Sequence, residues 1–185
     1  LQGKQTQKVL AFYKPVGVTC TERDPHAEKK IMDMIRYPER LTYAGRLDKD
    51  SEGLILLTND GDLINVMMRG ANRHEKEYIV KTDREITPDF LEKMAKGIYL
   101  KDLDITTREC EIEQIGKFTF RIVLTQGVNR QIRRMCEACG YRVKALKRIR
   151  IMNILLGDLK PGKWREVTGE ELEQLQRDTG MLNRN

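Results

Sequence analysis

The sequence predicts an α+β fold in which a mainly antiparallel sheet is flanked by helices. Segments with strand periodicity and segments with helix periodicity occur in mixed order, without the steady β-α-β alternation of a doubly wound sheet. A chain of 185 residues fits one domain or two small lobes around a shared core, and we expect a single domain over residues 1–185. The content of 39% hydrophobic and 34% charged residues is typical of a folded chain.

Several segments have the alternation or composition of β-strands. In chain order they are residues 8–14, 53–58, 76–82, 108–115, 117–124 and 142–151. Residues 53–58 form a continuous apolar run, which suits a strand buried on both faces. In residues 117–124 apolar and polar side chains alternate, which predicts one face in the core. Gly116 joins that strand to the one before it and predicts a hairpin.

Helices are predicted where apolar residues recur every three or four positions beside capping residues. They begin after Pro25, after Asp60, at Thr87, near Asn129 and after Thr168. The third ends at Gly97, and the fourth spans residues 129–139 with Gly140 behind it. Thr168 with Glu171 predicts a capping box, in which each side chain accepts a hydrogen bond from the backbone of the other.

Positive charge is concentrated in one segment of the chain. The net charge is +6, yet residues 129–150 carry eight basic residues against the single acid Glu137, a net charge of +7 that leaves −1 for the rest. A basic patch on an otherwise balanced chain favours binding to the phosphate backbone of a nucleic acid. The alternative is a solvated helix face beside a strand.

Composition disfavours membrane proteins and zinc proteins. No apolar run approaches the roughly 20 residues needed to span a bilayer, and the polar N-terminus lacks the apolar core of a signal peptide, so the cytoplasm is the expected location. Cys136 and Cys139 form a single C-x-x-C pair. Because Cys20 and Cys110 do not supply the second pair of a zinc site, we expect free, buried thiols and no bound metal.

Candidate catalytic or metal-binding carboxylates cluster in residues 45–54, where Asp48, Asp50 and Glu52 occupy alternate positions. Their spacing resembles the first half of a calcium loop, but the twelfth position is Asn59, where a bidentate Glu is required. Pairs of these carboxylates could serve glycosidase chemistry, but side chains two residues apart give no evidence of the opposed geometry it needs. Spacing alone favours a third interpretation, in which Asp48 or Asp50 caps the turn before the following strand.

Residues 45–63 begin Gly-Arg-Leu-Asp, continue to Ser-Glu-Gly-Leu, and closely resemble the signature of pseudouridine synthases of the RsuA-type branch. Further segments agree with that family in the same order: residues 14–17, 75–78, 127–135 and 146–151. The resemblance extends over about residues 9–175. Within the branch, the segments most similar to the RluF group, which modifies large-subunit ribosomal RNA, are residues 74–78, 129–136 and 150–153.

The resemblance implies the pseudouridine synthase fold with a central active-site cleft, and it implies roles for individual residues. Asp48 aligns with the catalytic aspartate, Tyr78 with the tyrosine that stacks on the target uracil, and Arg133 with the cationic partner of the carboxylate. Arg46 is similar to the arginine that holds the extruded nucleotide, and Ile132 to the apolar residue against the uracil. The candidate phosphate contacts are Lys14, Arg130, Arg134, Lys147, Arg148 and Arg150.

The implied reaction breaks the bond between ribose C1′ and uracil N1, rotates the base and rejoins the ribose at C5. A lone carboxylate suffices, whether it attacks the ribose or the base or first deprotonates C2′, so no cofactor or metal is expected. The expected partner is RNA, foremost large-subunit ribosomal RNA, with transfer RNA or an inert RNA-binding role as alternatives. We expect a monomer without the N-terminal S4-type RNA-binding domain that members of the family usually carry.

Overall fold

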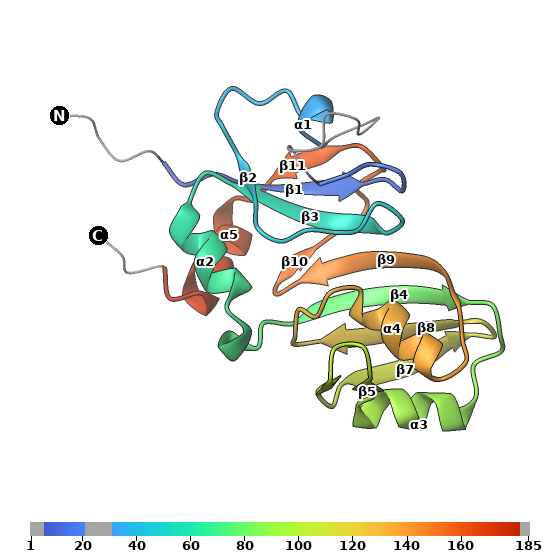
Figure 1. Ribbon diagram of the computed structural model, residues 1–185. Coiled ribbons are helices and arrows are strands. Elements are labelled where there is room, and N and C mark those ends of the chain that lie inside the picture. The colour runs from blue at the N-terminus through green and yellow to red at the C-terminus, as the bar shows by residue number, and fades with distance from the viewer. Residues whose placement is uncertain (1–5, 21–30, 182–185) are drawn as a thin grey trace. The chain divides into compact units, whose positions relative to one another are not determined.

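The computed structural model describes residues 6–20 and 31–181, and the chain divides into two compact units. The first unit comprises residues 1–72 and 153–185, and the second comprises residues 73–152 (Figure 1). The helix predicted after Pro25 falls largely outside the described residues, apart from the short α1 (Ile31–Met34). No helix in the described ranges is both long enough and apolar enough to cross a membrane.

In the first unit, β1 (Val9–Lys14) lies between β11 (Trp164–Glu166) and β3 (Glu52–Thr58), and both neighbours run antiparallel to it. The short β2 (Thr42–Tyr43) also pairs with β3. Every residue of β1 and residues 53–58 of β3 are buried, so the prediction of a strand buried on both faces is confirmed. One face packs into a cluster that includes Leu10, Phe12, Ile31, Ile55 and Leu57.

The helix predicted after Asp60 is present as α2 (Gly61–Met68), followed by a single 3₁₀ turn, η1 (Gly70–Asn72). Asp60 is its N-cap, because its Oδ1 accepts hydrogen bonds from the backbone N–H groups of Asp62 at 2.9 Å and Leu63 at 3.3 Å. The cap that the sequence predicts is therefore confirmed.

The capping box predicted for the last helix, α5 (Gly169–Asp178), is wrong. Thr168 occupies the N-cap position but its side chain makes no capping hydrogen bond. Glu171 is instead engaged by Arg165, whose Nη1 and Nη2 donate to Oε1 at 2.6 Å and Oε2 at 2.9 Å. A bidentate, charge-assisted pair is stronger than the single backbone contact that the box would supply. The two-residue strand β10 (Ile154–Leu155) also belongs to this unit.

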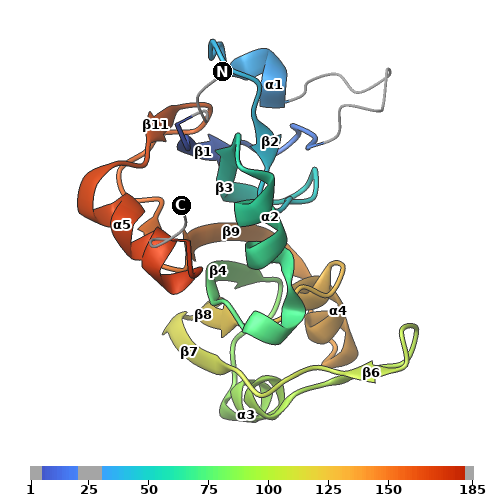
Figure 2. The same cartoon turned by 90° about the vertical axis from the view of Figure 1, so that its left-hand side faces the viewer.

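The second unit is built on four antiparallel strands and two helices. The strands follow the order β9 (Val143–Ile151), β4 (Lys76–Thr82), β8 (Thr119–Leu124) and β7 (Glu111–Gly116). The helices α3 (Pro88–Lys96) and α4 (Gln131–Ala138) pack against one face of this sheet. The core between them includes Val80, Phe90, Met94, Phe120, Ile122 and Met135. A hairpin of β5 (Tyr99–Leu100) and β6 (Ile105–Thr106) projects from the unit in Figure 2.

The helix predicted from Thr87 to Gly97 is confirmed at both ends. Thr87 Oγ1 accepts a hydrogen bond from the backbone N–H of Phe90 at 3.1 Å, and a proline occupies the first turn. Gly97 has a φ of +104°, and a Cβ there would lie 2.3 Å from the carbonyl oxygen of Thr107. Only glycine therefore fits at this C-cap.

The strand predicted over residues 108–115 begins later, at Glu111. The backbone N–H of Arg108 donates to Gln126 Oε1 at 2.8 Å, and that of Cys110 donates to the carbonyl of Ala95 at 2.9 Å. Because these two amides are already satisfied, they are not available to a strand ladder.

Candidate active site

The loop that carries Asp48 lies between β2 and β3 of the first unit. It opens at Gly45, whose φ of +109° is a conformation that residues with a side chain rarely adopt. Asp48 is half-buried, and its carbonyl oxygen accepts a hydrogen bond from the backbone N–H of Ser51 at 3.1 Å. Arg46 is exposed, with its guanidinium carbon 5.7 Å from the ring centroid of Tyr43.

The backbone is held on both sides of Asp48 by the segment that follows β1. The thiol of Cys20 donates to the carbonyl of Leu47 at 3.2 Å and accepts from the N–H of Leu47 at 3.4 Å. The N–H of Gly17 donates to the carbonyl of Lys49 at 2.8 Å. The sequence predicts only a buried thiol at Cys20, because nothing in the residue pattern indicates which backbone groups it meets.

Lys14 also holds the loop that carries Asp48. Its side chain is fully buried, and Nζ donates to the carbonyls of Pro15 at 2.6 Å, Val18 at 2.8 Å and Lys49 at 3.4 Å. Burial lowers the pKa of Lys14, while nearby acidic groups that include Asp48 oppose that shift. An ammonium that is buried and bound to three carbonyls is not presented to solvent, so Lys14 supports the loop and does not offer the phosphate contact predicted for it.

The calcium-loop interpretation does not fit the local structure. A calcium hand needs a helix after its loop, whereas residues 52–58 form strand β3. The Glu52 carboxylate also accepts a hydrogen bond from the hydroxyl of Tyr13, and burial followed by this hydrogen bond raises the pKa of Tyr13 to about 12. Among the residues that the structure describes, no three His, Cys, Asp or Glu side chains are placed to hold a metal ion.

The four cysteines are all free thiols, as predicted. Cys20 and Cys136 are buried, whereas Cys110 and Cys139 are half-buried. Burial raises the pKa of the Cys136 thiol to about 12 and that of Cys110 to about 11. Thiols held protonated in this way are poor nucleophiles and poor metal ligands.

Tyr78 belongs to the second unit, on the face of the sheet that α3 and α4 cover. It lies opposite Ile122 of β8 and Arg148 of β9, and it packs against the core cluster that contains Ile132 of α4. Arg148 is only 3% exposed. The structure therefore gathers Tyr78, Ile132 and Arg148 on one side of β4.

Helix α4 presents the other predicted arginines. Arg130 is exposed and adopts a left-handed conformation at the N-cap, with φ +50° and no side-chain cap. A non-glycine residue in this conformation is uncommon and is enriched at functional sites. Arg133 is half-buried, and Arg134 Nε donates to the carbonyl of Asn129 at 2.9 Å. The loop before α4 is thereby tied to the helix.

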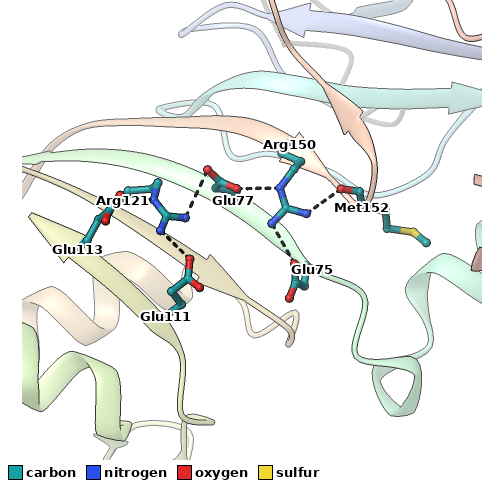
Figure 3. A network of polar contacts seen from close by, with 7 residues as sticks. All are labelled: Glu75, Glu77, Glu111, Glu113, Arg121, Arg150 and Met152. Carbon is teal, nitrogen blue, oxygen red and sulfur yellow. Dashed lines mark hydrogen bonds and ion pairs between the residues drawn. The ribbon is translucent and has the colours of Figure 1, made fainter. Parts of the chain in front are cut away.

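Arg150 lies on the opposite face of the sheet, in a network of arginines and glutamates (Figure 3). The network consists of Glu75, Glu77, Glu111, Glu113, Arg121, Arg150 and the carbonyl of Met152. Arg150 Nε lies 2.7 Å from Glu77 Oε1 and Nη2 lies 3.0 Å from Glu75 Oε1. Arg121 is bound by three glutamates at N–O distances from 2.6 to 3.5 Å. Four carboxylates thus neutralise two guanidinium groups, and the charge of Arg150 is not available for a phosphate.

The predicted site residues fall into the two units. The first unit holds Lys14, Arg46 and Asp48, and the second holds Tyr78, Arg130, Ile132, Arg133, Arg134, Lys147, Arg148 and Arg150. Lys147 is half-buried opposite Ile79, so it projects on the side of β4 away from Tyr78.

Comparison with known proteins assigns these features to one family. A model of the RNA pseudouridylate synthase family matches residues 8–138. The chain is 47% identical over 167 residues to the dual-specificity RNA pseudouridine synthase RluF of Escherichia coli (strain K12), covering 90% of this chain and 57% of that protein. It is 34% identical over 177 residues to the ribosomal large subunit pseudouridine synthase B of Vibrio cholerae, covering 91% of this chain and 54% of that protein.

A solved structure agrees with the sequence relatives. The crystal structure of a pseudouridylate synthase matches with a TM-score of 0.86 and 28% sequence identity, covering 95% of this chain and 76% of that one. The α+β architecture is therefore the pseudouridine synthase fold, as predicted. The chain belongs to the RNA pseudouridine synthase family, and its resemblance to the RsuA-type branch and to RluF is confirmed. It spans 57% and 54% of the lengths of the RluF and synthase B relatives.

Proposed function

We propose that this chain converts a uridine of large-subunit ribosomal RNA into pseudouridine, with Asp48 as its catalytic carboxylate. The observation that carries the proposal is the fixed position of Asp48, on a loop whose backbone is held on both sides by Cys20 and Gly17. A carboxylate held in this way can act on a nucleotide without first being ordered. The names of the RluF and synthase B relatives support RNA, and large-subunit RNA in particular, as the substrate.

The other residues have supporting parts in this proposal. Tyr78 stacks on the uracil, Ile132 packs against it and Arg133 supplies positive charge for the reaction, as the family resemblance implies. Arg46 holds the extruded nucleotide. The phosphate contacts are Arg130, Arg134, Lys147 and Arg148, whereas Lys14 and Arg150 are engaged within the protein. We further propose that the protein acts as a monomer in the cytoplasm, where its RNA substrate is found.

The test uses an in vitro transcript of 23S ribosomal RNA that carries tritium at uridine C5. Pseudouridine formation joins C5 to the ribose and releases the C5 hydrogen to water, so each turnover releases tritium. We expect the wild-type protein to release tritium and Asp48→Asn to lose at least about a thousandfold in rate, because the amide cannot replace the carboxylate as nucleophile or base.

The matched control is Asp158→Asn, an exposed aspartate of the same unit that has no hydrogen bond or ion pair among the described residues. It removes the same charge and is expected to keep wild-type activity. Full tritium release by Asp48→Asn would overturn the assignment of the catalyst. Release from bulk transfer RNA and not from the 23S transcript would move the substrate to transfer RNA, and binding without any release would favour an inert RNA-binding protein.

A further inference from the structure

An exposed methionine lies at the end of helix α2, on a side of the helix that is otherwise polar. The helix buries Leu63 and Met67, whereas its exposed side chains before the last residue are those of Asp62 and Asn65. Met68 follows with 57% of its surface exposed. A single exposed apolar residue is common on a protein surface, so the significance of Met68 depends on what lies beside it.

Met68 lies against the loop that carries Asp48. A Cβ at Gly45 would be 3.9 Å from the sulfur of Met68, which is an ordinary van der Waals distance. Gly45 opens that loop, and the exposed Arg46 follows it directly. The Met68 side chain is therefore next to the start of the segment that leads to Arg46 and Asp48, and all of these residues belong to the first unit.

The end of α2 is held in place by Asn72. Its Nδ2 donates to the carbonyl of Val66 at 2.9 Å, and its backbone N–H donates to the carbonyl of Arg69 at 3.1 Å. Carbonyls in the last turn of a helix have no partner within the helix, so these bonds fix the turn that carries Met68 and Arg69. Arg69 is exposed, and among the described residues its guanidinium has no hydrogen bond or ion pair.

We propose that Met68 binds an unstacked base of the substrate RNA next to the target uridine, and that Arg69 contacts a phosphate beside that base. This proposal rests on the proposed function, because it takes Asp48 as the catalytic carboxylate. Extrusion of a target nucleotide breaks its stacking with its neighbours, so the neighbouring bases expose their apolar faces. A thioether is polarisable and packs favourably against an aromatic ring, while an arginine supplies the charge that a phosphate requires.

Cations accompany the exposed methionine, which favours RNA over an apolar protein segment as the occupant. Arg46 follows the glycine that Met68 lies against, and Arg69 follows Met68 itself, and both arginines are exposed. A protein partner that docks through apolar contacts needs an extended apolar surface, whereas the other exposed side chains of α2 are polar. One apolar side chain with two cations beside it matches a nucleotide, which presents an aromatic face and a negative charge.

The experiment measures equilibrium binding of the 23S transcript at several salt concentrations. All proteins carry Asp48→Asn, so that the RNA is not converted during the measurement. We expect Met68→Ser to weaken affinity about five- to tenfold without changing the slope of log affinity against log salt, because an apolar contact releases no counterions. Met68→Leu keeps an apolar side chain and is expected to bind with nearly the affinity of the parent protein. Arg69→Gln is expected to lower the slope by about 0.7 to 0.9, the value for one phosphate contact.

Two controls separate a base contact from other effects. Leu155→Ser replaces an apolar side chain of the same unit that is 54% exposed, and it is expected to leave affinity unchanged. A fully paired RNA duplex offers no unstacked base, so Met68→Ser is expected to bind it as tightly as the parent protein does. The urea midpoint of unfolding is expected to be the same in Met68→Ser and its parent, because the side chain is mostly exposed.

Each outcome decides the proposal. Unchanged affinity of Met68→Ser for the 23S transcript would overturn it, and so would a loss that Met68→Leu does not restore or that is equally large on the duplex. An unchanged salt slope in Arg69→Gln would overturn the phosphate contact. Tritium release by the protein with Asp48 intact is scored separately and tests the proposed function. RNA binding that depends on Met68 but is not followed by tritium release would support the base contact while removing the catalytic proposal.

Discussion

The charged side chains on the two faces of strand β4 lie in different surroundings. On one face Glu77 joins Arg121 and Arg150 in a network in which each guanidinium has carboxylate partners (Figure 3). On the other face Lys76 lies among apolar side chains, next to Arg148, with no carboxylate acting on it. We call the face of Glu77, Arg121 and Arg150 the closed face, and the face of Lys76 and Tyr78 the open face, because burial lowers the pKa of Lys76 there and no carboxylate acts on that pKa.

The net charge of a sequence segment is therefore a poor guide to the charge that RNA meets on the folded protein. Arg148 and Arg150 come from the same basic strand and would share a face if β9 were regular. The register of β9 shifts between Glu77 and Tyr78, so that Arg150 lies opposite Glu77 and Arg148 lies opposite Tyr78. This irregularity sends two neighbouring arginines to opposite faces, and Arg150 meets Glu75 and Glu77 on its face.

The largest expected effect is on stability at the open face. At pH 7, Lys76→Met is expected to raise the free energy of unfolding of the RNA-free protein by up to about 3 kcal/mol, because it removes a charge that folding desolvates. The unfolded chain binds the lysine proton more tightly than the folded one. Stability of the wild type therefore rises from about pH 8 toward pH 10.5, where the advantage of the variant disappears.

Urea unfolding at pH 7, 8.5 and 10 measures this effect, with Lys81→Met as the control. Lys81 is exposed on the other face, and its replacement is expected to change stability by less than about 0.5 kcal/mol. A destabilised Lys76→Met at pH 7 would mean that the ammonium makes net favourable contacts in the free protein. The contrast between the two faces would then fail.

A smaller effect of opposite sign is expected at the closed face. Arg121→Met leaves three glutamates close together, one of them Glu77 with only 17% of its side chain exposed. We expect the free energy of unfolding to fall by about 2 kcal/mol, since Glu111 and Glu113 lose their guanidinium partner and all three carboxylates then repel one another, with Arg150 left to compensate Glu77. Chemical denaturation compares Arg121→Met with Lys117→Met. The side chains of Lys117 and its partner Glu85 are 68% and 62% exposed, so their ion pair is expected to contribute under about 1 kcal/mol. Equal losses in the two variants would show that the network is no stronger than an exposed pair.

Much of the fold follows from periodicity and local capping chemistry. The apolar run at residues 53–58 and the caps at Asp60 and Thr87 are decided by a few adjacent residues, and they are found as predicted. The late start of β7 and the missing capping box at Thr168 are not determined by neighbouring residues in the sequence. They depend on Gln126 and Arg165, which reach the affected backbone and side chain only after the chain has folded.

Features of the candidate site also divide into those that the sequence predicts and those that depend on long-range contacts. Family resemblance finds the motif that contains Asp48, but not that Cys20 and Lys14 hold its loop, because those contacts join segments about 30 residues apart. The surroundings of Lys76 cannot be predicted from the sequence for a related reason. A lysine between two glutamates looks compensated in the sequence, and only the strand register shows that both glutamates face Arg150 instead.

The smallest effect concerns the arginine that the closed face neutralises. Arg150→Gln is expected to leave the salt dependence of RNA binding unchanged, because its guanidinium already contacts Glu75, Glu77 and the carbonyl of Met152. Arg130→Gln removes the same charge from an exposed position at the start of α4, and we expect it to lower the salt slope by about 0.7 to 0.9.

Both variants are compared on the 23S transcript, with unfolding measured in parallel. Arg150→Gln is expected to cost about 1 kcal/mol of stability, which identifies its contribution as internal. If Arg150→Gln reduced the slope as much as Arg130→Gln, the glutamates would have to release the guanidinium when RNA binds. The closed face would then be an RNA-binding surface. The ion pairs of the free protein would not predict which arginines and lysines contact RNA.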